Sequence, residues 1–335
     1  MNKAETTTTS AIGLDIGTSR VVAAWQEDSG YQYRSELNSF VTLPMSRLTE
    51  SVLRREGVPH NVVGSSIIVH GNESERFADL LQVDTRRPMT KGTLNAAEPE
   101  SMNMIRQIVQ SMVGPAKEKG QKLVYSVPAA PLGAGDSLTY HDATLKQVLE
   151  EMGYDVKSIN EGLAVVYSEM ESTNYTGIGI SCGGGLCNVC MSYLAVPVMQ
   201  FSIPKAGDYI DSSAASVTGD IANRLRMVKE ESFYFNGAFA DKSHQVLGVY
   251  YDDMIASLVG ALRDGVATHR SLPKIGRQLP LVLSGGTTMP KGFRDRFEKV
   301  LREADFPIAL SEVRMAEKPL LTTAKGALVA AMSEF

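Results

Sequence analysis

Apolar and polar positions along the chain alternate between strand-like runs and segments of helical spacing, and their order predicts an α/β protein. Short apolar runs predict strands at Ala11–Ile16, Val21–Trp25, Leu123–Val127, Val156–Ile159, Thr176–Ser181, Cys187–Leu194, Val196–Ile203 and Leu281–Leu283. Apolar residues three and four apart predict helices at Pro99–Val113, Asp142–Met152, Gly162–Met170, Asp208–Val228, Asp252–His269, Lys291–Glu303 and Leu320–Met332. Residues 36–94 are irregular and polar, which indicates an inserted subdomain.

Two Gly-rich hairpins occupy equivalent places in the two halves of this pattern. Ile12–Val22 reads as strand, GLDIGTS, strand, and Ile178–Val189 reads as strand, SCGGGLC, strand. Two copies of one unit indicate an ancient duplication. We therefore expect pseudo-two-fold symmetry, with the hairpins meeting across a central cleft.

The composition narrows the possible partners and compartments. The 335 residues are 43% hydrophobic, enough for two cores, and the formal net charge of -5 argues against direct binding to nucleic acid. The N-terminus lacks the apolar region of a signal peptide, no apolar run is long enough to span a membrane, and no basic amphipathic tail is visible. We expect a cytoplasmic protein with no membrane anchor.

The cysteines and histidines do not predict a metal centre. Cys182, Cys187 and Cys190 match part of a ferredoxin-type spacing, but the chain has no fourth cysteine. We interpret them as small apolar residues of buried strands in a reducing compartment. The five histidines are scattered without the spacing of metal ligands.

The two glycine turns carry the candidate chemistry. Glycine lets a backbone approach phosphates closely, and a tight turn directs successive N–H groups toward an anion. The turns are Gly17, Thr18 and Ser19, and Gly183, Gly184 and Gly185. Asp15 precedes the first turn and could hold Mg²⁺ through water, while Arg20 follows it.

The order of five motifs resembles the actin-like ATPase superfamily over nearly the whole chain, from Ile12 to about Ala331. GLDIGTSR and ISCGGGLCNV resemble its two phosphate motifs, and NEGLAVVYS and AKGALVAA look like its two connecting helices. LVLSGGTTMPKGF is similar to its adenosine motif. The resemblance implies ATP or ADP with Mg²⁺ as ligands, and it adds Glu161, Gly285, Gly286 and Thr287 to the binding residues.

Within the superfamily, the chain resembles bacterial actins of the MreB and MamK type. RRPMTKGTL, KAGDYIDSSAA and RMVKEE look like segments of those proteins, which implies that Gly207 and Lys229 lie near the nucleotide. From the residues alone, Lys205 and Lys229 could each reach the nucleotide or be solvated. The implied function is a filament-forming homopolymer, with a cargo or adaptor protein as a further partner.

The implied fold is actin-like (ribonuclease-H-like) and duplicated, with two lobes that each contain a mixed sheet flanked by helices and a nucleotide cleft between them. We expect lobe I at 8–35, 95–165 and 318–335, with a small insertion at 36–94. We expect lobe II at 166–206 and 270–317, with a second insertion at 207–269.

The chain departs from the family pattern where hydrolysis would be assisted. Ser181 and Leu186 stand where the second phosphate motif usually has Asp and Thr, so a contact to the water of a metal ion is weakened. His141 or Asp142 could position the attacking water, but we favour the interpretation that Asp142 caps the following helix. Because phosphoryl transfer depends on charge compensation, we expect nucleotide binding with slow or impaired hydrolysis.

Two other functions remain open at this stage. A small-molecule kinase of the same superfamily would need a catalytic Asp and a sugar pocket, for which the sequence has no convincing equivalent. A non-polymerising regulatory or scaffold protein would accommodate the degenerate second motif. The chain has no G-x-x-x-x-G-K-[ST] loop, which excludes a P-loop enzyme. The sequence does not choose between ATP and GTP.

Overall fold

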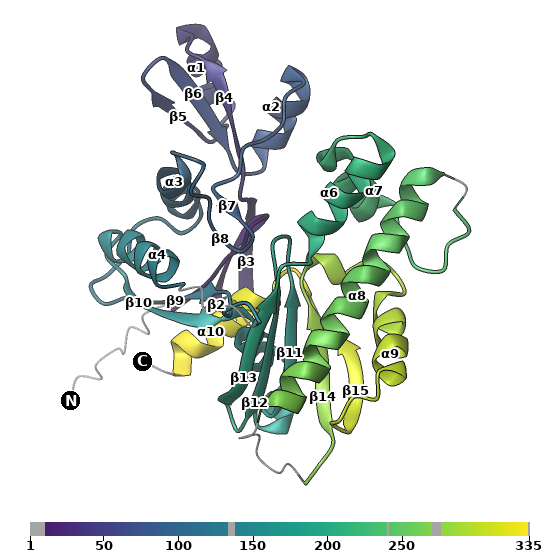
Figure 1. The fold of residues 1–335 in the computed structure, drawn as a ribbon. Coiled ribbons are helices and arrows are strands. Elements are labelled where there is room, and N and C mark those ends of the chain that lie inside the picture. Colours follow the sequence, from purple (N-terminus) through teal and green to yellow (C-terminus); the bar gives the residue numbers. More distant parts are fainter. Residues whose placement is uncertain (1–10, 133–137, 240, 270–275, 334–335) are drawn as a thin grey trace, which may run out of the picture.

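The two lobes of the chain stand side by side in Figure 1, and each is built on a five-stranded sheet. The computed structural model describes residues 11–132, 138–239, 241–269 and 276–333. The sheet of lobe I contains β1 (Ile12–Ile16), β2 (Arg20–Glu27), β3 (Gly30–Leu37), β9 (Lys122–Val127) and β10 (Asp155–Asn160). The sheet of lobe II contains β11 (Gly177–Cys182), β12 (Cys187–Tyr193), β13 (Val196–Ile203), β14 (Leu279–Ser284) and β15 (Leu310–Met315).

The two sheets have the same topology. The strand order is β10-β9-β1-β2-β3 in lobe I and, in reverse, β15-β14-β11-β12-β13 in lobe II. In each sheet three strands form an antiparallel meander, and the first of them pairs in parallel with a later strand, β1 with β9 and β11 with β14. The duplication inferred from the glycine hairpins is therefore visible in the strand pairing.

Helices α5 (Glu161–Glu169) and α10 (Thr322–Ser333) cross between the sheets and join the lobes. Small residues let them approach closely: a Cβ added at Gly326 would lie 1.8 Å from the carbonyl oxygen of Ala164. Gly162 is also closely packed, because a Cβ there would lie 2.7 Å from the backbone nitrogen of Cys190. The pivot between the lobes is thus a backbone-to-backbone contact.

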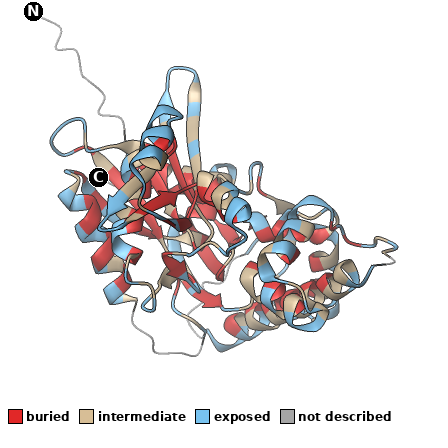
Figure 2. Cartoon of the chain, turned by 90° about the horizontal axis from the view of Figure 1, so that it is seen from above, coloured by how far each residue is buried: buried red, intermediate tan, exposed pale blue. Residues whose placement is uncertain are grey.

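Further helices cover the outer face of each sheet, and the buried residues concentrate along the sheets (Figure 2). In lobe I, α3 (Ser101–Val113) and α4 (Thr139–Glu151) share a core with β1 and β9. In lobe II, α8 (Lys242–Thr268) and α9 (Phe293–Glu303) share a core with the sheet.

An insertion extends each lobe at the same end of the molecule (Figure 1). On lobe I it comprises β4 (Phe40–Pro44), α1 (Arg47–Arg55), β5 (His60–Val63), β6 (Ser66–His70), α2 (Glu73–Leu81), β7 (Met89–Thr90) and β8 (Thr93–Leu94). On lobe II it comprises α6 (Gly207–Thr218) and α7 (Ala222–Glu231). Ion pairs link the two insertions: Arg87 Nη1 lies 2.8 Å from Asp208 Oδ1, and Arg226 pairs with Glu75.

Two predicted helices differ from the structure. The segment expected as one helix from Asp208 to Val228 is two helices, because Gly219 adopts a left-handed φ of 79° and ends α6. The helix expected at Asp252 begins instead at Lys242, where the Asp241 side chain accepts a hydrogen bond from the N–H of His244. Across the described residues, no helix combines the length and apolarity that crossing a membrane requires.

Candidate functional site

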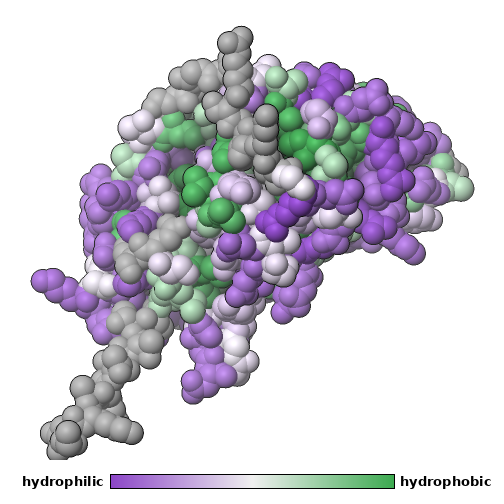
Figure 3. Space-filling view, turned by 90° about the horizontal axis from the view of Figure 1, so that it is seen from below, coloured by the Kyte–Doolittle hydropathy of each residue, from purple (hydrophilic) through white to green (hydrophobic). Residues whose placement is uncertain are grey.

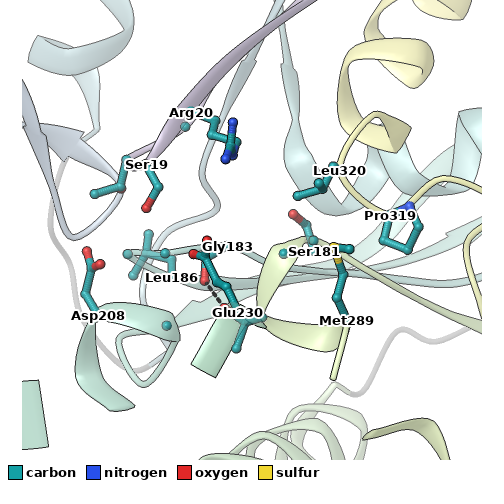
Figure 4. Close-up of a pocket in the computed structure, with 18 of the residues that line it drawn as sticks. Ser19, Arg20, Ser181, Gly183, Leu186, Asp208, Glu230, Met289, Pro319 and Leu320 are labelled. Atoms are coloured by element: carbon teal, nitrogen blue, oxygen red, sulfur yellow. Dashed lines mark hydrogen bonds between the residues drawn. The ribbon is translucent and has the colours of Figure 1, made fainter. Parts of the chain in front are cut away.

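A cavity of about 450 Å³ lies between the lobes, and both glycine turns line it (Figure 4). The predicted residues that line it are Asp15, Gly17, Thr18, Ser19, Arg20, Glu161, Ser181, Gly183, Gly184, Gly185, Gly207, Lys229, Gly285, Gly286 and Thr287. Residues far apart in the sequence therefore converge on one cavity, as expected for a cleft between duplicated halves.

Each of the two turns is closed by an equivalent backbone hydrogen bond. The N–H of Gly17 donates to the carbonyl of Arg20 at 2.9 Å, and the N–H of Gly183 donates to the carbonyl of Leu186 at 2.9 Å. Arg20 and Leu186 thus hold equivalent places. By the same register, Asp15 in lobe I is equivalent to Ser181 in lobe II.

The tips of the turns face each other closely enough to require glycine. A Cβ at Gly184 would lie 2.1 Å from Ser19 Oγ, and one at Gly185 would lie 2.4 Å from Thr18 Oγ1. The N–H of Gly92, in the β7–β8 turn, donates to Thr18 Oγ1 at 3.0 Å and fastens the insertion of lobe I to the first turn.

The tips also present unused donors. In the part of the chain that the structure describes, the N–H groups of Thr18, Ser19, Gly184 and Gly185 donate to no protein acceptor. The carbonyl of Gly183 is occupied, because it accepts from Thr287 Oγ1 at 2.7 Å and from the N–H of Gly207 at 3.1 Å. The turns therefore direct donors, and few acceptors, toward each other, which is the arrangement of an anion site.

Two carboxyl groups lie at the base of the turns. Burial raises the pKa of Asp15 to about 6, while a 2.6 Å hydrogen bond from Ser126 Oγ opposes the shift. Burial, and then the nearby Asp15, raise the pKa of Glu161 to about 8; Ser181 Oγ donates to Glu161 Oε2 at 3.2 Å. The pair therefore tends to share a proton near neutral pH.

This donor set does not amount to a metal site of its own. Among the residues that the structure describes, no three or more His, Cys, Asp or Glu side chains are placed to hold a metal ion. One oxygen of Asp15 is already engaged by Ser126, and lobe II offers the hydroxyl of Ser181 at the equivalent place. A hard cation would need most of its oxygen ligands from elsewhere.

The cations near the cavity differ in their availability. Lys229 is buried and paired with Asp211, with Nζ 2.8 Å from Oδ2, while Asp211 Oδ1 has no partner among the described residues. Lys205 pairs with Asp253 at 2.7 Å and does not line the cavity. Within the described ranges, the guanidinium of Arg20 has neither a hydrogen bond nor an ion pair.

The far end of the cavity is more apolar. Met289, Pro319 and Leu320 lie near one another there (Figure 4), and Pro290, Phe233 and Tyr251 also line the cavity. Gly285 packs there with a φ of 94°, and a Cβ at this residue would lie 2.2 Å from the carbonyl oxygen of Cys182. A planar, largely apolar group fits this end, while the N–H tips suit an anion at the other.

His141 and Asp142 lie in α4 and do not line the cavity. His141 Nδ1 accepts from the N–H of Leu94 at 3.3 Å, and burial lowers the pKa of His141 to about 4. Asp142 accepts a 2.6 Å hydrogen bond from the hydroxyl of Tyr125 and does not cap the helix, since α4 begins at Thr139. Neither side chain joins the other predicted residues.

The sequence pattern missed several lining residues, namely Gly92, Asp208, Asp211, Arg226 and Glu230. Asp211 had a detectable signal, because Asp208 and Asp211 fall one helical turn apart after Gly207. Gly92 had none, since its contact with Thr18 joins residues 74 positions apart.

Comparisons with known proteins identify a family and solved structures that this chain resembles. The sequence profile of the protein family described as Volactin matches residues 10–331. A comparison with curated proteins found no match.

Solved structures resemble the chain over almost its entire length. A MamK double helical filament shares 19% identity, with 97% of this chain and 99% of that chain covered and a TM-score of 0.73. MreB 5 of Spiroplasma citri bound to AMPPNP shares 15% identity, with coverage of 98% and 97% and a TM-score of 0.71. The ethanolamine utilization protein EutJ from Carboxydothermus hydrogenoformans shares 13% identity, with coverage of 97% and 91% and a TM-score of 0.58. These likenesses confirm the predicted actin-like fold.

Proposed function

The chain belongs to the volactin family, within the actin-like ATPase superfamily, and on this premise we propose that it is a cytoplasmic cytoskeletal protein that binds ATP between its lobes and polymerises. The observation that carries the proposal is the pair of facing glycine turns with unused N–H groups. The solved structure of MreB 5 of Spiroplasma citri, which has the same fold as this chain, is bound to AMPPNP.

The rest of the cavity suits a nucleoside. The free Oδ1 of Asp211 lies buried beside the paired Lys229, and a ribose hydroxyl would satisfy it as a donor. The base would lie against Met289, Pro290 and Leu320. Adenine and guanine share this apolar character, and the five-motif resemblance favours adenine.

Hydrolysis should be slow. Ser181 replaces a carboxylate at the base of the second turn, and the Glu161 carboxyl beside it retains a proton up to about pH 8. A protonated carboxyl is a poor acceptor for the proton of an attacking water. Asp15 is the carboxylate that would hold Mg²⁺ through water, and the ion would supply charge compensation to the phosphates.

Self-association has support at both ends of lobe II. Leu194, in the β12–β13 turn, and Val196, at the start of β13, are 48% and 61% exposed. Val217 and Ile221, at the α6–α7 end, are 46% and 59% exposed. Figure 3 shows apolar areas between polar ones on the face seen from below. Apolar surfaces at opposite ends suit head-to-tail stacking, which builds an open filament.

Sedimentation tests polymerisation directly. We expect the protein to pellet with ATP and to remain in the supernatant without it, and we expect Val196→Asp to lower the pelleted fraction. Val249→Asp is the matched control, because Val249 is 65% exposed on the flank of α8. Protein that binds ATP but stays monomeric would refute the filament and favour a regulatory or scaffold protein.

Phosphate release tests the proposal about hydrolysis. We expect slow turnover in the wild type and a faster rate in Ser181→Asp, because the added carboxylate restores charge beside the phosphates. Fast wild-type turnover that Ser181→Asp fails to raise would contradict it.

A further inference from the structure

Strand alternation aims the Arg20 side chain into the cavity. Successive side chains of a strand point to opposite faces. Val21 is fully buried in the core of lobe I, whereas Arg20 and Val22 both line the cavity. In Figure 4 the Arg20 side chain extends from β2 into the space between the lobes, above Ser181.

Arg20 is an available cation beside the phosphate-binding turns. Four cationic side chains line the cavity within the described residues: Arg20, Arg226, Lys229 and Lys291. Arg226 is paired with Glu75 and Lys229 with Asp211. Lys291 follows Pro290 and is exposed, whereas the carbonyl of Arg20 itself closes the first glycine turn.

The pseudo-symmetry of the turns shows that lobe II supplies no equivalent charge. Leu186 occupies the place of Arg20, and its side chain packs against Gly92, where an added Cβ would lie 2.3 Å from Leu186 Cδ1. Ser181 occupies the place of Asp15. The second turn thus contributes N–H groups and an apolar contact, and lobe I contributes both the cation and the ionisable acid next to a turn.

We propose that Arg20 binds the terminal phosphates of the nucleotide and supplies charge compensation there, so that triphosphate affinity depends more on Arg20 than on a divalent cation. A guanidinium offers several donors in a planar fork that matches phosphate oxygens, and it stays charged at every relevant pH. The proposal rests on the proposed nucleotide function. It accords with a donor set in which one oxygen of Asp15 is engaged by Ser126 and lobe II offers the hydroxyl of Ser181 at the equivalent place.

Nucleotide titration of four proteins tests the role of Arg20. The proteins are the wild type, Arg20→Gln, Arg20→Lys and the control Arg47→Gln. The control removes one exposed guanidinium from α1, which lies at the outer end of the lobe I insertion (Figure 1) and does not line the cavity. Each is titrated with ATP in Mg²⁺, with ATP in EDTA, and with adenosine, which has no phosphate. Thermal unfolding of each variant checks that it is folded.

The expected result is selective. Arg20→Gln should weaken ATP binding in EDTA by about tenfold to hundredfold, the range for a lost charged hydrogen bond, and should leave adenosine binding unchanged. The ATP affinity of Arg20→Lys should lie between those of Arg20→Gln and the wild type, and the ATP affinity of Arg47→Gln should match that of the wild type. The wild type should lose less than about tenfold in affinity when EDTA replaces Mg²⁺.

Two results would overturn the inference: a folded Arg20→Gln that binds ATP in EDTA as tightly as the wild type, or a wild type whose ATP binding disappears in EDTA. If the wild type binds neither ATP nor adenosine in any condition, the proposed function itself fails. The two failures are therefore distinguishable.

Discussion

The contact between α5 and α10 leads to a prediction in which one substitution has opposite effects at two glycines. Gly326 of α10 packs on Ala164 of α5, and an added Cβ would lie 1.8 Å from the carbonyl oxygen and 2.5 Å from the carbonyl carbon of Ala164. Gly260, in α8, has no atom within 4 Å of the same added Cβ. Both glycines lie inside helices, so the gain in helix propensity should be similar.

The magnitudes follow from these distances. Gly260→Ala should stabilise the protein by up to about 1 kcal/mol, the helix propensity difference. Gly326→Ala gains the same term, but the helices must separate until the new contact reaches ordinary van der Waals distance. Because both partners are backbone atoms, no rotamer change can relieve the contact, and overpacking of this kind costs about 1–3 kcal/mol. We expect a net destabilisation of up to about 2 kcal/mol.

Urea unfolding measures the difference. Trp25, the single tryptophan, lies on β2 in lobe I and reports on the lobe that α10 packs against. The unfolding midpoint should rise for Gly260→Ala and fall for Gly326→Ala. Equal midpoints, or a higher one for Gly326→Ala, would refute the conclusion that the pivot is a rigid backbone contact.

Two further predictions concern the cleft. Burial, and then Asp15, raise the pKa of Glu161 to about 8, so the folded protein keeps a proton that the unfolded chain releases near pH 4.5, and stability falls as pH rises between these values. Glu161→Gln should therefore resist urea better than the wild type near about pH 8.5 but match it near about pH 5, and a pH-independent difference would contradict this cause. The partly exposed Arg87–Asp208 ion pair links the two lobes, so Arg87→Gln should speed release of a fluorescent nucleotide by about two- to fivefold. Added salt should reproduce this effect in the wild type, and an unchanged rate in both experiments would show that the pair does not hold the cleft closed.

Local signals in the sequence predicted most of the fold. The glycine hairpins, β9, β13 and α5 follow from apolar runs bounded by Gly or Pro, and the structure places them within a residue or two of the predicted bounds. The break at Gly219 also had a local cause, a glycine that ends a helix in the left-handed region, but the apolar pattern continued across it. Helix α8 was predicted too short because its first turns are mixed in polarity.

The sequence predicts those parts of the site that are formed by residues close together in the chain, but not the contacts between distant segments. Each turn is recognisable alone, but the facing of Gly184 and Ser19 joins residues 165 positions apart and depends on how the lobes close. The pairing of Lys229 with Asp211 depends on the packing of α7 on α6. His141 and Asp142 follow the glycine-containing sequence PLGAGDS, where sequence position fixes spatial position poorly.

The equivalence of Arg20 and Leu186 explains why the two turns could diverge. Each turn is closed by a backbone hydrogen bond across four residues, and the close approach of the tips requires only that Gly184 and Gly185 have no side chain. The last residue of each turn, by contrast, contributes its carbonyl to closure, so its side chain is free to be charged or apolar. A duplicated fold can therefore preserve its anion cradle while one half gains a cation and the other an apolar contact with Gly92. The chemistry of the cleft is then asymmetric although its backbone is not, and a test at Arg20 examines that asymmetry separately from the fold.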